Sequence, residues 1–212
     1  MKEIIRALRK KGLEVKSKLI NMLKTAEKVY SQQLEMYRKK VHRGAERRVS
    51  FHRPYVRPIK RGKQGKEVEF GGKGAVVHVD GFLFLDRFEH RAFAEEKLLR
   101  THLQAYQERF GKMPSSVTAD SKYGTRANRR KLSKAKVRAA FRPLGRRAKK
   151  SQENEQWFRK KQKERNRIEG SFGHGKEHFG LDRVRYAGKD GSEIWVRCGI
   201  LAMNLMTAMK RA

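Results

Sequence analysis

The stretch GAVVHVDGFLFLD, residues 74–86, contains the clearest structural pattern in the chain. Two apolar runs, residues 75–79 and 82–85, flank the pair Asp80-Gly81. An Asp-Gly pair between two such runs is the usual two-residue turn of a β-hairpin, because both residues tolerate a positive φ. The stretch therefore predicts an antiparallel hairpin with Asp80 in its turn and Asp86 closing its second strand.

Helices and strands are expected to alternate after the hairpin. The pattern predicts a helix over residues 93–106, a short strand over 116–119, a helix over 125–134 and a strand over 137–141. Residues 153–178 have helical spacing, and Ser192 is expected to cap a last helix that runs towards Lys210. This order indicates a mixed α/β layer fold.

The segment before the hairpin divides into a helix and a basic stretch. Residues 13–38 carry apolar side chains in steps of three and four, which predicts a long amphipathic helix with a Lys-rich outer face. Residues 42–66 combine many Arg and Lys with Pro54 and Pro58 and predict an extended connector. Both basic surfaces are either phosphate contacts or solvated charge.

The composition limits the classes of function that this chain can have. The 212 residues include 54 Lys and Arg against 22 Asp and Glu, a net charge of +32, which indicates a polyanionic partner. No apolar run of about 18 residues is present, so we expect a cytoplasmic, nucleoid-associated protein without membrane contact. Cys198 is the single cysteine, which excludes an internal disulfide and a Cys-rich zinc site, and its apolar neighbours predict a buried thiol.

Two carboxylates stand where their function needs an explanation. Asp120 ends the strand over residues 116–119, a position from which side chains face the cleft of an open sheet. Glu169 lies among basic residues, four residues after Arg165 and seven before Lys176, so the three share one helix face. Either acid viewed alone is explained by an ordinary ion pair. Together, a carboxylate that binds a metal and two cations that hold phosphates suit phosphodiester chemistry.

This pattern resembles insertion-sequence transposases that have a DDE ribonuclease H-like domain. Their signature around the last acid is Tyr-x2-Arg-x3-Glu-x6-Lys, and this chain has Gln162-x2-Arg165-x3-Glu169-x6-Lys176, so three of the four positions match. Further stretches look like successive blocks of the catalytic half of such proteins: residues 56–59, 61–63, 68–71, 119–123, 143–146 and 165–172. The resemblance covers roughly residues 20–212.

The resemblance implies an α/β fold with a ribonuclease H-like mixed sheet, flanking helices and a long N-terminal helix. It implies carboxylates that hold two Mg²⁺ ions, with Mn²⁺ as a substitute. Asp120 corresponds to the second catalytic, metal-binding acid and Glu169 to the third. The expected DNA contacts are Arg165, Lys176, Arg57, Arg61 and Lys63. The implied partners are double-stranded DNA, at the element ends and the target, and a second copy in a homodimer.

The first acid of the family belongs on the first sheet strand, upstream of an insertion that resembles residues 13–66. No such strand pattern precedes Leu13. We therefore expect a helical arm over residues 1–45, a basic connector over 46–66 and an incomplete domain over 67–212, in a truncated or split transposase. Asp86 is the best internal substitute and Glu46 the weakest. A missing central strand would expose a sheet edge.

Other features allow simpler interpretations. His174 and His178 stand four residues apart beside Glu177, but the HExxH order of zinc sites is absent. Three glycines at 170, 173 and 175 indicate either close approach of another backbone or DNA, or a broken helix. The last helix is read as core, with Ile194, Trp195, Leu201, Leu205 and Met209 as its packing residues.

The leading function is therefore a transposase that binds, cleaves and joins DNA. The alternative is a catalytically inactive DNA-binding remnant, which would hold DNA through phosphate contacts alone. A ribosomal type of RNA-binding protein fits the charge, but it has no use for the acid and base face around Glu169.

Overall fold

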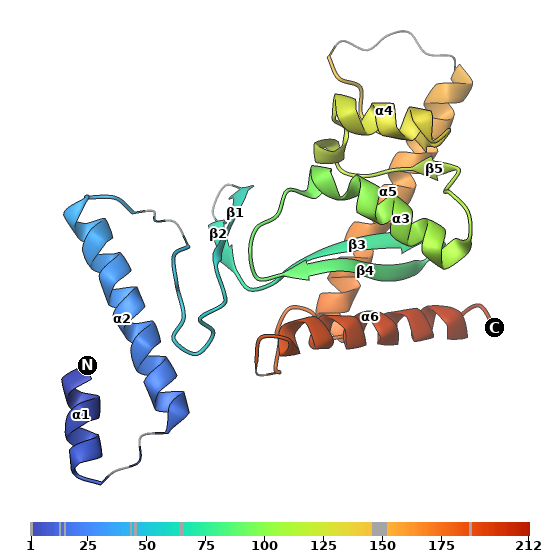
Figure 1. Cartoon of the computed structure of the whole chain (residues 1–212). Helices are drawn as coiled ribbons and strands as arrows, with labels where there is room; N and C mark the ends of the chain where they lie inside the picture. The colour runs from blue at the N-terminus through green and yellow to red at the C-terminus, as the bar shows by residue number, and fades with distance from the viewer. Residues whose placement is uncertain are drawn as a thin grey trace. The chain divides into compact units, whose positions relative to one another are not determined.

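In a computed structural model the chain forms two units, each described here by itself (Figure 1). Unit 1 comprises Met1–Lys73 and Glu89–Ala92, and unit 2 comprises Gly74–Phe88 and Phe93–Ala212. The structure describes all residues except 1, 13, 15, 43, 45, 64–65, 146–151 and 187. The side chains of residues 2, 4, 9, 61–63, 66–67 and 152 are also outside the description.

Unit 1 contains two helices and a hairpin. The helices are α1, Lys2–Lys10, and α2, Ser17–Arg38, so the long helix predicted from Leu13 is confirmed with a later start. The strands β1, Pro58–Lys63, and β2, Lys66–Phe70, pair antiparallel with Pro58 opposite Phe70. The end of the basic stretch is therefore one strand of a hairpin. Its backbone groups are hydrogen-bonded to residues 66–70, so this part is not the unpaired connector that was predicted.

The predicted hairpin of unit 2 is confirmed. Its strands are β3, Lys73–Val79, and β4, Phe82–Glu89, which pair in one two-stranded sheet. Asp80 and Gly81 have φ values of 47° and 87°, the left-handed conformation that a two-residue turn requires for its twist to match the strands. Glycine adopts this conformation without a Cβ clash, and aspartate is among the residues that tolerate it.

The remaining elements of unit 2 follow in the predicted order. They are η1 (Glu95–Leu98), α3 (Leu99–Phe110), β5 (Ser116–Val117), η2 (Ser121–Tyr123), α4 (Arg126–Lys134), β6 (Arg138–Ala139), α5 (Gln152–His178) and α6 (Gly191–Met209). β5 and β6 pair in parallel. The mixed α/β class is confirmed. The described strands form three separate two-stranded sheets, so the continuous ribonuclease H-like sheet stays a prediction.

One hydrophobic core lies between the β3–β4 hairpin and α6, which runs along the hairpin in Figure 1. Its buried residues are Leu83, Leu85, Ile200 and Met203. The Asn204 side chain joins the two elements, because its Nδ2 donates to the Leu83 carbonyl at 2.8 Å and its Oδ1 accepts from the Leu83 amide at 2.8 Å. This pair of bonds satisfies both backbone groups of Leu83 and fixes which face of α6 is buried.

Three predictions about α6 were wrong. The helix begins at Gly191 after the N-cap residue Asp190, so Ser192 lies buried in the first turn and is not the cap. Only one face of α6 is core, and Leu201, Leu205 and Met209 are exposed. Cys198 is exposed as well. The apolar composition around Cys198 predicted burial, but the rotation of the helix on the hairpin turns it outward.

A second core holds α3, α4 and the β5–β6 pair together. Its buried residues are Leu99, Leu132, Val137 and Phe141, and Leu132 is fully buried. The Thr125 hydroxyl caps α4 by accepting from the Asn128 amide at 3.2 Å. None of the helices in the described part of the chain is long and apolar enough to cross a lipid bilayer.

Leu132→Ala is expected to lower the free energy of unfolding of unit 2 by about 2 to 5 kcal/mol, because it leaves a cavity in a closed core. Urea denaturation followed by tryptophan fluorescence measures this unit alone, since Trp157 and Trp195 are the two tryptophans and both belong to it. Leu144→Ala is the matched control: Leu144 is exposed, so its change should stay within about 0.5 kcal/mol. Equal effects of the two substitutions would contradict the assigned core.

Candidate active site

Asp120 lies in a tight turn at the exposed surface of unit 2. It is the N-cap residue of η2, and its Oδ1 accepts from the Ser121 amide at 2.6 Å and from the Ser121 hydroxyl at 3.2 Å. Both bonds use the same oxygen. The side chain is therefore held in one direction by local backbone geometry while it remains accessible to a ligand.

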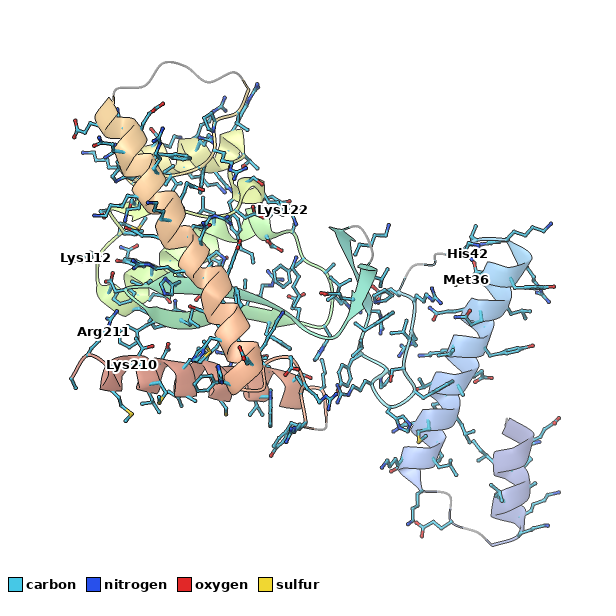
Figure 2. All side chains as sticks on the ribbon, turned by 180° about the vertical axis from the view of Figure 1, so that it is seen from behind. Met36, His42, Lys112, Lys122, Lys210 and Arg211 are labelled. Atoms are coloured by element: carbon cyan, nitrogen blue, oxygen red, sulfur yellow. The ribbon has the colours of Figure 1, made fainter. Side chains whose placement is uncertain are left out.

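The turn that carries Asp120 is anchored to the protein interior. The Tyr123 amide donates to the Asp120 carbonyl at 3.0 Å. The buried Asn128 side chain donates from Nδ2 to the carbonyls of Tyr123, at 2.9 Å, and Glu96, at 2.8 Å. Because Asn128 belongs to α4 and Glu96 to η1, three elements fix this turn. Lys122, which Figure 2 labels, stands in the same turn and adds a cation beside Asp120.

A buried polar network lies behind the turn. The Asp86 side chain on β4 is 1% exposed, and it is held by His102 Nδ1 at 2.5 Å and by an Arg109 guanidinium nitrogen at 2.5 Å. His102 Nε2 lies 3.3 Å from the Tyr123 hydroxyl. With the proton on Nδ1, the ring donates to Asp86 and accepts from Tyr123. The network therefore connects β4, through α3, to the Asp120 turn.

The pKa values of this network follow from its burial and its partners. Burial raises the pKa of Asp86, but the hydrogen bonds from His102 and Arg109 and the electrostatic attraction of these two groups outweigh it, so the pKa is lowered overall. Burial, followed by the nearby carboxylates Glu95, Asp86, Glu96 and Asp120, raises the pKa of Tyr123 to about 12. Asp86 is thus a buried carboxylate whose two oxygens are bound by His102 and Arg109. These bonds argue against Asp86 as the substitute for the first metal ligand.

Glu169 lies on one continuous helix, as the shared-face hypothesis requires. α5 runs unbroken over Gln152–His178, which excludes the broken-helix alternative. Arg165, Glu169 and Lys176 therefore fall on one side of α5. An Arg165 guanidinium nitrogen lies 3.4 Å from Glu169 Oε1, and the Glu169 side chain is 67% exposed. The Arg165 side chain is 23% exposed. Because the carboxylate is largely in solvent, the pair contributes only about 0 to 1 kcal/mol to stability, and the Glu169 oxygens stay accessible to ligands.

The glycines of α5 have different surroundings. A Cβ on Gly175 would approach Leu181 Cδ1 to 2.7 Å and Met203 Sδ to 3.0 Å, so this glycine allows close packing against the α5–α6 loop and α6. A Cβ on Gly170 or Gly173 would meet nothing within 4 Å. The close approach expected for the three glycines is therefore found only at Gly175.

The two histidines of α5 give no support to a zinc site. The rings of His174 and His178 pack against each other with centroids 4.5 Å apart, and His178 Nε2 lies 3.7 Å from Glu177. Among the residues that the structure describes, no group of three His, Cys, Asp or Glu side chains is placed to hold a metal ion.

A polar cavity of about 520 Å³ lies beside the Arg165 end of this face. It is lined by Arg142, Pro143, Gly145, Phe158, Gln162, Arg165 and Asn166. Gln162, which stands where the family signature has Tyr, donates to the Ala140 carbonyl at 2.8 Å and so ties α5 to the residue after β6. The glutamine that replaces the signature tyrosine therefore holds α5 against the end of β6.

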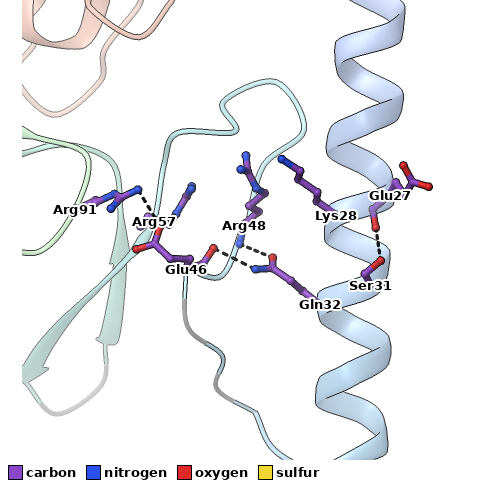
Figure 3. Close-up of a pocket in the computed structure, with 8 residues that line it drawn as sticks. All are labelled: Glu27, Lys28, Ser31, Gln32, Glu46, Arg48, Arg57 and Arg91. Carbon is purple, nitrogen blue, oxygen red and sulfur yellow. Dashed lines mark hydrogen bonds and ion pairs between the residues drawn. The ribbon is translucent and has the colours of Figure 1, made fainter.

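Arg57 has a structural position, contrary to its expected role as a DNA contact. It is only 9% exposed, and its guanidinium donates to the carbonyls of Pro54, at 2.7 Å, and Val56, at 2.9 Å, and to Glu46, at 3.2 Å. Figure 3 shows Glu46 between Arg57 and Arg91, with Gln32 bonded to the Glu46 carbonyl. The side chains of Arg61 and Lys63 lie outside the described residues.

Residues 117–205 match the family model described as Transposase DDE domain. This segment is therefore similar to the DDE domain of transposases. The DDE segment includes Asp120 near its start and the Arg165, Glu169 and Lys176 face in its second half. No curated protein and no solved structure matches the chain.

The segment that matches the family model contains carboxylates of the chemical type that Mg²⁺ prefers. Asp120 and Glu169 both present exposed carboxylate oxygens, and hard divalent cations bind such oxygens and keep several waters. Sequence reasoning missed the network behind the Asp120 turn, which consists of Asp86, His102, Arg109 and Tyr123. Its members are spread over residues 86–123, and no regular spacing connects them.

Proposed function

We propose that this chain binds double-stranded DNA and takes part in metal-dependent phosphodiester cleavage and strand transfer during DNA transposition, as a homodimer at the nucleoid in the cytoplasm. The observation that carries the proposal is the match of residues 117–205 to a transposase DDE domain that includes both candidate acids. The net charge of +32 supports a DNA partner, since a chain so basic repels itself unless a polyanion neutralises it.

Asp120 and Glu169 are the residues that would hold Mg²⁺, or Mn²⁺ in its place. A metal held there would supply the activation of a water or a 3′-hydroxyl and the stabilisation of the leaving oxygen at phosphorus. The chain's own residues position the substrate. The η2 turn holds the Asp120 carboxylate in one direction, and Arg165 and Lys176 on the Glu169 face bind DNA phosphates.

We also propose that the domain is ribonuclease H-like. The antiparallel β3–β4 hairpin and the parallel β5–β6 pair belong to the same unit and supply two parts of such a mixed sheet.

The alternative function, a DNA-binding protein without catalysis, is favoured by one observation. In the described part of the chain no third His, Cys, Asp or Glu side chain completes a metal group with Asp120 or Glu169. Such a protein would still bind DNA through its cations, with an affinity that falls steeply as salt rises.

Cleavage of supercoiled plasmid and of short duplex DNA by the purified chain separates the two functions. The transposase proposal expects nicking that appears with Mg²⁺ or Mn²⁺ and disappears with a chelator. Asp120→Ala protein purified in parallel controls for contaminating nuclease. Tight salt-sensitive binding without metal-dependent nicking would instead establish the non-catalytic function.

Lys176→Ala is expected to reduce the slope of log affinity against log salt by about 0.9 for duplex DNA, because one phosphate contact is lost. Affinity is measured by fluorescence anisotropy over a salt series. Arg57→Ala is the matched cation control: its guanidinium is buried on backbone carbonyls, so the slope should be unchanged. If Arg57→Ala reduced the slope and Lys176→Ala left it unchanged, Arg57 and not Lys176 would be the phosphate contact.

A further inference from the structure

The buried polar network reaches the Asp120 turn through the side chain of Tyr123. Asp86 on β4 binds His102 and Arg109, which are seven residues apart and so lie on one face of α3. The Asp86 bond is made by Nδ1 of the His102 ring, and the other ring nitrogen, Nε2, lies 3.3 Å from the Tyr123 hydroxyl. The buried carboxylate therefore sets the orientation of the imidazole that holds Tyr123.

Tyr123 is the last residue of the turn, and Asp120 is the N-cap residue at its start. The Tyr123 amide donates to the Asp120 carbonyl at 3.0 Å, and the Gly124 amide donates to the Ser121 carbonyl at 2.9 Å. Within the same turn the Ser121 amide holds Asp120 Oδ1 at 2.6 Å. Because the turn is so short, a shift of the Tyr123 end moves the amide that directs the Asp120 carboxylate.

Two other bonds hold the backbone at the end of the turn. Asn128 Nδ2 donates to the Tyr123 carbonyl at 2.9 Å, and Arg129 Nε donates to the Gly124 carbonyl at 2.9 Å. Both bonds end on backbone oxygens. The contact with His102 differs from them, because it holds the Tyr123 side chain and ties the turn to α3.

Stability alone does not account for this network. A buried ionic network adds little net stability compared with apolar packing, because the desolvation of its charges offsets their attraction. Its hydrogen bonds are directional, so a satisfied network specifies one arrangement of the side chains that it joins. Residues that bind a metal commonly depend on such partners for their orientation. The arrangement that this network specifies includes the turn that carries Asp120.

We propose that His102 and Tyr123 are positioning residues for the Asp120 carboxylate. Their contact holds the turn in the conformation in which Oδ1 accepts from the Ser121 amide and the other oxygen, Oδ2, is left for a divalent cation. The metal-binding part of this proposal rests on the proposed function, whereas the positioning of the turn is independent of it. The two parts are therefore tested by separate measurements.

Hydrogen exchange of the backbone amides in the metal-free chain, measured by NMR, tests the positioning of the turn. His102→Asn keeps a donor near the Nδ1 position for Asp86 but has no group at the Nε2 position, whereas His102→Gln keeps an acceptor near Nε2. The Tyr123 and Gly124 amides should exchange roughly 5-fold faster in His102→Asn, as expected for the loss of one hydrogen bond. They should keep wild-type rates in His102→Gln. Equal rates in the two variants would overturn the proposal.

Mn²⁺ affinity, measured by electron paramagnetic resonance, tests the consequence for Asp120. The quantity compared is the part of Mn²⁺ binding that Asp120→Ala removes. Tyr123→Phe and His102→Asn should each raise its Kd about 10-fold, the lower end of the range for residues that support a metal ligand. The double variant should also show about 10-fold, because both substitutions remove one contact. A product of about 100-fold, or an unchanged Kd in either single variant, would refute the positioning role.

Ile200→Ala is the control for a loss of stability without a change at the turn. Ile200 is buried in the core between the hairpin and α6, so its truncation lowers the stability of unit 2 far from the network's residues in that core's list. Both readouts should keep their wild-type values, and changes as large as those of His102→Asn would contradict positioning. If wild type shows no Asp120-dependent Mn²⁺ binding, the proposed metal-dependent function fails, and amide exchange in the two His102 variants still decides whether the turn is positioned.

Discussion

Asp120→Ala and Glu169→Ala are each expected to lower the rate of Mg²⁺-dependent DNA cleavage at least about 100-fold. Even residues that only support a metal ligand change metal affinity by about 10- to 100-fold, so removing a ligand itself should exceed this. Cleavage of labelled duplex under single-turnover conditions gives the rate. A second readout, Mn²⁺ bound at equilibrium measured by electron paramagnetic resonance, should fall in both variants.

Glu177→Ala provides the matched control for Glu169→Ala. Glu177 is an exposed carboxylate on the same helix, eight residues further along, and it lies off the Arg165, Glu169 and Lys176 face. Its removal should leave cleavage and Mn²⁺ binding unchanged. Wild-type rates and Mn²⁺ binding in Glu169→Ala, or equal losses in Glu177→Ala, would refute the assignment of Glu169.

Asp86→Ala is expected to destabilise unit 2 by about 2 to 4 kcal/mol, because it leaves His102 and Arg109 without their buried partner. The lower part of the range reflects Arg109, which is partly exposed and can recover solvent contacts. Urea denaturation followed by tryptophan fluorescence measures the loss. Asp182→Ala, an exposed acid of the same unit, should change stability by no more than about 0.5 kcal/mol.

The pH dependence of this contribution has a definite sign. The pKa of Asp86 is lowered in the folded protein, so between that pKa and the ordinary unfolded value of about 3.9 the unfolded state binds more protons. The stability difference between wild type and Asp86→Ala should stay constant above about pH 5 and shrink as the pH falls below about 4. A difference that grows towards acid pH would contradict the charged network.

The parts that sequence predicted correctly depend on neighbours along the chain. The hairpin follows from the Asp80-Gly81 turn between two apolar runs, and the face shared by Arg165, Glu169 and Lys176 follows from helix geometry once the helix continues. The transposase resemblance rested on the spacing around Glu169 and on blocks spread over residues 56–172, and the family match confirms it over residues 117–205. Each of these properties is encoded within a window of about one element.

The features that the sequence did not reveal depend on partners far away in sequence. Arg57 looks like any other cation in a basic stretch, and only the fold turns its guanidinium onto backbone carbonyls and Glu46. Asp86 closes a strand, but its partners His102 and Arg109 lie on a later helix. The local sequence does not show which residues such a side chain will contact, because those contacts form only when separate helices and strands pack together.

The sequence by itself determined the basic character of this protein, its alternating elements, its hairpin and the spacing of the acid and base face on α5. Only the tertiary structure decided which surfaces remain open. α6 has apolar residues all round, so its sequence does not select a buried side. The choice is made by Asn204 and Leu83, whose paired hydrogen bonds set the rotation of the helix and leave Leu201, Leu205 and Met209 exposed.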